Sequence, residues 1–182
     1  RYTGKLAVAT LPGVVAAVTA RDMLKQLFDQ PWIVGWALLV TGAMLWTTRS
    51  TLPRAHESEP SWGQALAIGC VQVLAIVPGI SRSGATVAAA LALGVAPVAA
   101  AEFSFLMAVA AIGGAALFEL PAALAAPGDV RGLLLLGGVV SGVSGIAALW
   151  LFVRLLHNQR FHDFAWYAWA AGLAVLAWLA LR

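Results

Sequence analysis

Long apolar segments separated by short polar stretches dominate this chain. The segments cover residues 6–20, 32–46, 62–77, 87–95, 98–120, 133–153 and 164–181. A helix needs about 20 apolar residues to cross a bilayer, with a range of about 17–25. The last three segments reach that length, and the second does so only with its flanking residues. The first is short and contains Pro12-Gly13, which predicts a broken helix.

The third and fourth segments differ from the others because a polar motif separates them and the fourth is too short to cross. This pattern predicts a re-entrant helix pair, which enters the membrane, turns at the motif and leaves on the same side. Ser61 and Gln64 form a capping-box pattern that would start the first arm. Pro78-Gly79 would end that arm, and Pro97 suits the first turn of the next helix.

The composition identifies the class of protein. Of 182 residues, 62% are hydrophobic and 10% are charged, and the mean hydropathy is +0.88. Soluble domains are about 25% charged, so we expect an all-α, polytopic membrane helix bundle that forms a single integral membrane domain over residues 1–182. The net charge of +3 comes from scattered Lys and Arg side chains, which argues against a nucleic-acid partner. A single cysteine, Cys70, allows no intramolecular disulfide.

The polar motif, Pro-Gly-Ile-Ser-Arg-Ser-Gly-Ala-Thr, carries the candidate chemistry. An arginine within apolar sequence is costly unless an anion or a polar group meets it. Its planar fork matches a phosphate, and backbone N–H groups near glycines and at a helix start favour negative charge. The candidate phosphate-binding residues are Gly79, Ser81, Arg82, Ser83, Gly84 and Thr86. The alternative is a polar hinge in which the arginine pairs with a carboxylate.

Two further polar residues in apolar sequence lie near the motif. Glu102 has three interpretations: the counter-charge of Arg82, a ligand of a divalent metal, or a first-turn carboxylate near the interface. Gln72 either satisfies backbone groups exposed at the break after the first arm or touches the site.

The motif and its surroundings resemble a known family. PGISRSGAT, preceded by QALAIGCVQVLAIV and followed by AAEFSF, is similar over residues 64–105 to the undecaprenyl-diphosphate phosphatases, the bacitracin-resistance membrane phosphatases. The resemblance implies a multi-pass enzyme of the bacterial inner membrane that removes one phosphate from undecaprenyl diphosphate. This reaction recycles the lipid carrier of peptidoglycan synthesis. The resemblance also implies that Arg82 and Ser81 are catalytic residues of this phosphatase. It further implies a divalent cation, Mg²⁺ or Ca²⁺, as cofactor.

The family also has a second motif, which pairs glutamates with a serine-serine-threonine-glycine-histidine stretch. No glutamate precedes Glu57 here, so the chain resembles the C-terminal two-thirds of a member. We therefore expect the nucleophile and base outside it, and the 182 residues alone to be inactive. A further departure is Ala168 after Tyr167, where the family pattern has arginine.

Two other functions fit the same residues. Paired re-entrant helices with a charge between them also occur in transporters, so a lipid-phosphate or anion transporter is the rival hypothesis. A structural membrane subunit whose hinge needs Arg82 is the third. The expected partners are a polyprenyl diphosphate lipid, the membrane itself and, as an option, further copies of the chain.

Overall fold

The structure is a computed structural model that describes residues 1–20, 27 and 29–181. Its elements are α1 (Tyr2–Thr19), α3 (Pro31–Thr51), η1 (Leu52–Arg54), α4 (Trp62–Leu74), α5 (Arg82–Ala92), α6 (Pro97–Ala125), α7 (Gly128–His157), η2 (Phe161–Asp163) and α8 (Phe164–Ala180). The two η elements are short 3-10 helices, and no strand occurs in the described ranges. The expected all-α class is confirmed.

Five of the described helices are long and apolar enough to cross a membrane: α1, α3 with η1, α6, α7, and α8 with η2. The chain is therefore a polytopic membrane protein. By contrast, α4 and α5 have only 13 and 11 residues and pack against each other. The motif begins in the turn between them and continues into the first half of α5. This is the expected helix pair. Pro97 occupies the first turn of α6, as its fixed φ favours.

Helix α1 corrects one expectation, because it runs without a break through Pro12-Gly13. A proline removes one backbone hydrogen bond, and packing against neighbouring helices lets membrane helices tolerate that loss. Here α1 lies closely along α4. A Cβ atom added to Gly69 of α4 would overlap the backbone of Ala9. After the proline, a Cβ atom added to Gly13 would lie 2.7 Å from the Gln72 side chain of α4. Contacts before and after Pro12 therefore hold α1 as one continuous helix.

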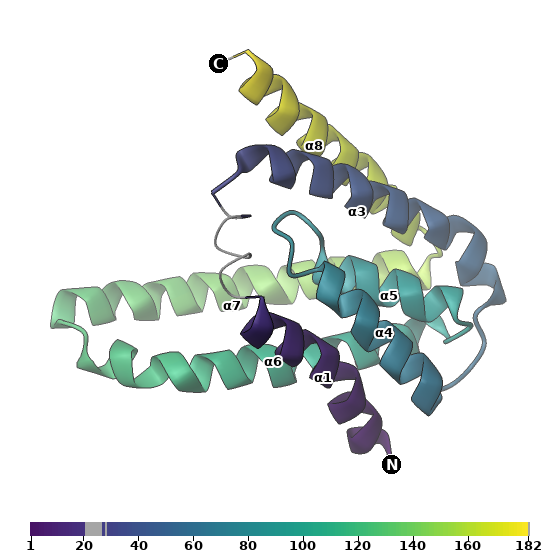
Figure 1. Ribbon diagram of the computed structural model, residues 1–182, viewed down its shortest axis with the longest axis horizontal. Coiled ribbons are helices and arrows are strands. Elements are labelled where there is room, and N and C mark those ends of the chain that lie inside the picture. The colour runs from purple at the N-terminus through teal and green to yellow at the C-terminus, as the bar shows by residue number, and fades with distance from the viewer. Residues whose placement is uncertain (21–26, 28, 182) are drawn as a thin grey trace.

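The helices are arranged around α5. It packs against α3, α4 and α6, while α1 packs against α4 and α6, and α3 pairs with α8. Figure 1 shows α3 and α8 lying together across the top of the view, and α6 and α7 extending to one side as a long hairpin. The motif is therefore at the start of the most enclosed helix.

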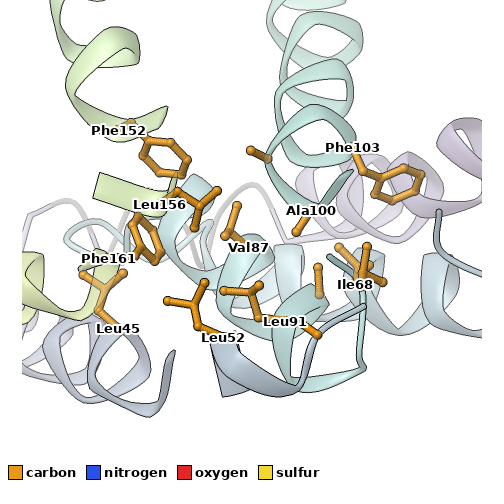
Figure 2. Close-up of a cluster of buried hydrophobic side chains, with 14 of the residues drawn as sticks. Leu45, Leu52, Ile68, Val87, Leu91, Ala100, Phe103, Phe152, Leu156 and Phe161 are labelled. Atoms are coloured by element: carbon orange, nitrogen blue, oxygen red, sulfur yellow. The ribbon is translucent and has the colours of Figure 1, made fainter. Parts of the chain in front are cut away.

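The apolar core surrounds the C-terminal half of α5. Figure 2 shows side chains from several elements meeting there: Leu45, Leu52, Ile68, Val87, Leu91, Ala100, Phe103, Phe152, Leu156 and Phe161. Small residues on the rest of α5 let its neighbours approach closely. This packing fixes the axis of α5, and with it the direction of its first turn.

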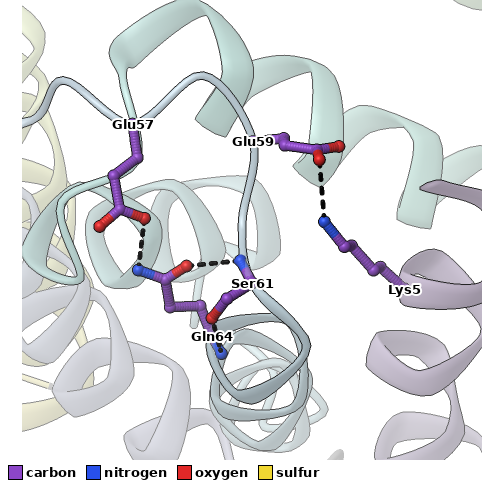
Figure 3. Close-up of polar contacts among 5 residues, drawn as sticks. All are labelled: Lys5, Glu57, Glu59, Ser61 and Gln64. Carbon is purple, nitrogen blue, oxygen red and sulfur yellow. Dashed lines mark hydrogen bonds and ion pairs between the residues drawn. The ribbon is translucent and has the colours of Figure 1, made fainter. Parts of the chain in front are cut away.

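A polar network fixes the base of the helix pair, at the opposite end from the motif (Figure 3). The capping box of Ser61 and Gln64 is confirmed. The Gln64 amide also donates to Glu57 at 2.7 Å and to the carbonyl of the C-cap residue of α5 at 2.9 Å. Beside it, Lys5 of α1 pairs with Glu59 at 3.1 Å. Both ends of the pair are thus held, one here and one at the motif.

Candidate functional site

The turn between α4 and α5 is pressed against α3. Gly79 lies within it with φ +100°, a left-handed conformation that favours glycine. A Cβ atom there would lie 2.7 Å from the carbonyl oxygen of Val34 and 2.9 Å from the Ala37 Cβ. Gly79 is therefore required both by its backbone angle and by the close approach of α3.

The hydroxyl groups of the motif have distinct surroundings. Ser81 is the N-cap of α5, and its Oγ accepts a hydrogen bond from the Gly84 N–H at 3.1 Å. Thr86 is buried, and its hydroxyl donates to the Arg82 carbonyl at 2.8 Å and shares a 2.6 Å hydrogen bond with Ser104 of α6. The Thr86 hydroxyl thus joins α5 to α6, whereas the Ser81 hydroxyl donates no hydrogen bond to another described residue.

Four of the predicted residues line one cavity. A space of about 450 Å³ lies between α3, the motif turn, α7 and α8, and Gly79, Ser81, Ser83 and Gly84 form part of its wall. The rest of the lining is mainly apolar and includes Phe152, Phe161, Phe164 and Tyr167. This arrangement gives a polar end, with hydroxyl groups at a helix N-terminus, and an apolar body.

Arg82 lines a different cavity. This space of about 440 Å³ lies between α1, α4 and α6, and Gln72 forms part of its wall. An Arg82 terminal nitrogen donates to the Gln72 Oε1 at 3.5 Å. Gln72 is 5% exposed, and its side chain contacts the arginine of the motif, as one of its two interpretations expects. No carboxylate of the described residues lies within 4.0 Å of Arg82, so the hinge hypothesis lacks the ion pair it requires.

Glu102 is exposed near the start of α6. Among the described residues it forms no ion pair with Arg82. Within the described residues, no group of three or more His, Cys, Asp or Glu side chains could hold a metal ion. The described residues thus give no ion pair that would make Glu102 the counter-charge of Arg82, and a role of Glu102 as a metal ligand stays a prediction.

Comparison with known proteins identifies the family. The family model described as bacitracin resistance protein BacA matches residues 1–174. The chain belongs to the BacA family. Proteins named undecaprenyl-diphosphatase match it from Desulfatibacillum aliphaticivorans (40% identical over 93% of the chain), Methanothermobacter thermautotrophicus (38% over 93%) and Pseudomonas aeruginosa (37% over 97%). This confirms the resemblance drawn from residues 64–105.

Two of these three relatives are longer than this BacA family chain, and the third has about the same length. The chain spans 62% of the Desulfatibacillum relative and 65% of the Pseudomonas relative, so each of these is about half as long again as the chain. It spans 96% of the Methanothermobacter relative. Members of both lengths therefore carry the same name.

Sequence reasoning missed two side chains of this BacA site. Thr41 of α3 contacts the motif turn, and Ser104 contacts Thr86. Ser104 could have been suspected as a polar residue in the Ala-Glu-Phe-Ser-Phe stretch after the motif. Thr41 carries no local signal, because its partners are 38 and 40 positions away.

Proposed function

We propose that the protein containing this chain is an undecaprenyl-diphosphatase of the bacterial plasma membrane. Water adds to the terminal phosphorus of undecaprenyl diphosphate, the P–O–P bond breaks, and undecaprenyl phosphate and inorganic phosphate leave. The names of the relatives support this activity, and the family description supports a link to bacitracin resistance. The monophosphate product would return to the lipid-carrier cycle of peptidoglycan synthesis.

The observation that carries the proposal is the position of Arg82 and the nature of its hydrogen-bond partner. It lies in the first turn of α5, where backbone N–H groups and the helix dipole favour an anion. It borders a cavity, and its one hydrogen-bond partner among the described residues is the neutral Gln72. Within the described part of the chain, no carboxylate pairs with this charge, and an arginine in that position is suited to a phosphate. Its charge would stabilise the negative charge that builds on the phosphate oxygens during transfer.

The serine-lined wall supplies the second part of the proposed site. Ser81 can donate its free proton to a phosphate oxygen while its Oγ caps α5, and Ser83 adds a second hydroxyl. Gly79 and Gly84 also form part of this wall. Since the first turn of α5 separates this wall from Arg82, the two phosphates of a diphosphate could contact its two faces.

The divalent cation implied by the family resemblance stays a prediction. The described residues offer no cluster of metal ligands, so we assign no step to the cation. If Glu102 contributes a ligand, we expect the other ligands from outside the described residues. We expect the group that activates the nucleophile from there as well.

The test is phosphate release by the complete protein in detergent, where no compartments exist. Arg82→Lys keeps the charge but loses the planar fork, so we expect turnover to fall by roughly 10²–10³-fold. Arg131→Lys, at an exposed position near the start of α7, is the matched control and should retain wild-type turnover. Equal turnover by the two variants would refute the assignment.

Transport is the second candidate function. The observation in its favour is that motif residues border two separate cavities, one through Ser81 and Ser83 and the other through Arg82. In vesicles, movement of labelled lipid between leaflets without phosphate release would establish a transporter instead of a phosphatase.

A further inference from the structure

We propose that Thr41 is the positioning residue of the motif turn, setting the phosphate-binding groups from the neighbouring helix α3. The inference rests on the proposed function, because the groups it positions are those assigned to the phosphate. Thr41 lies in the middle of α3, far from the motif in sequence. It is 4% exposed and does not itself belong to the motif.

The Thr41 hydroxyl makes two hydrogen bonds across to the turn. The O–H group donates to the carbonyl of Gly79 at 3.0 Å, and its oxygen accepts from the backbone N–H of Ser81 at 3.1 Å. Among the described residues, these backbone groups have no other hydrogen-bond partner. One hydroxyl therefore satisfies a donor and an acceptor that would otherwise lie against the packed α3.

This behaviour is unusual for a hydroxyl in a helix. Ser and Thr side chains within helices commonly bond to a carbonyl three or four residues earlier. The other hydroxyl residues near the end of α3 all do so: Thr47, Thr48, Ser50 and Thr51. Thr41 instead uses both its donor and its acceptor on a segment about 40 positions away. Its side chain is thus committed to the turn and not to its own helix.

The two bonds control the geometry of the site. Ser81 is the N-cap of α5, so the position of its backbone sets where the first turn begins. Arg82 and Ser83 follow directly in that turn. Without the hydroxyl, a partly buried carbonyl and a partly buried N–H group lose their partners, and we expect the turn to shift so that they reach others. A displacement of about 1 Å in catalytic groups can cost about 10²-fold in rate.

The experiment compares three variants of the complete protein with the wild type. Thr41→Val keeps the shape and removes the hydroxyl, and Thr41→Ser restores the hydroxyl. Thr48→Val is the control, because Thr48 is a buried threonine of the same helix that bonds only to α3 itself. For each, kcat and KM for phosphate release from undecaprenyl diphosphate are measured, with amide hydrogen exchange of residues 77–84.

We expect Thr41→Val to lower kcat by roughly 10- to 100-fold, with little change in KM, and to speed exchange of the Ser81 amide. Thr41→Ser should restore both, and Thr48→Val should behave as wild type. Wild-type kcat in Thr41→Val, or an equal loss in Thr48→Val, overturns the inference. If the wild type releases no phosphate, the proposed function fails instead. Amide hydrogen exchange of the motif turn then decides whether Thr41 positions it. An unchanged exchange rate of the Ser81 amide in Thr41→Val overturns the inference, and a faster rate supports it.

Discussion

Replacing Gly79 with alanine is the sharpest test of how closely α3 and the motif turn are packed. The left-handed φ of +100° costs a residue with a Cβ roughly 1–2 kcal/mol. The new methyl group would also lie 2.7 Å from the Val34 carbonyl oxygen and 2.9 Å from the Ala37 Cβ, and overpacking of this kind costs about 1–3 kcal/mol. Together, the two effects predict a loss of about 2–5 kcal/mol in the free energy of unfolding.

The measurement is reversible unfolding of the protein in mixed micelles with increasing SDS, followed by circular dichroism. Gly63→Ala is the matched control, because a Cβ atom at Gly63 meets nothing within 4 Å and α4 is helical there. That change should leave stability unaltered or raise it by up to about 1 kcal/mol. If Gly79→Ala were as stable as Gly63→Ala, the close contact between α3 and the turn would be refuted.

Three further predictions follow from the described contacts. Ser104→Ala removes the 2.6 Å partner of the buried hydroxyl on α5 and should lower stability by about 1–2 kcal/mol, whereas Ser144→Ala, at an exposed hydroxyl, should have no measurable effect in the same titration. Glu59→Gln leaves the buried ammonium of Lys5 without its charged partner and should destabilise more than Lys5→Met, which removes the charge as well. The 182 residues expressed alone should release no phosphate; metal-dependent release abolished by Glu102→Gln would show instead that this chain holds the catalytic carboxylate.

Local sequence signals predicted much of the fold. Ser61 and Gln64 cap α4, and Pro97 begins α6, because each effect depends only on residues within one turn of a helix. The pair formed by α4 and α5 could be predicted because two apolar segments flank one polar turn. The candidate phosphate-binding residues could be named from local sequence as well, because the residue types of the motif stand out within apolar sequence.

The errors and omissions all concern contacts between distant segments. Pro12 predicted a break that packing of α1 on α4 prevents. Thr41 could not be found, because a threonine in an apolar helix gives no sign of a partner on another element. The sequence also could not show that Arg82 and the motif serines border different cavities, since that depends on the rotation of α5 about its axis.

The pairing of α3 with α8 has a consequence for biosynthesis. The Trp169 indole donates to the Leu39 carbonyl at 3.1 Å across 130 positions of sequence. At a translation rate of about 5–20 residues per second, the ribosome needs roughly 7–26 s to make that interval. Helix α3 therefore enters the membrane well before its main partner exists. Because α3 also presses on Gly79, the support of the motif turn is completed only when α8 is inserted.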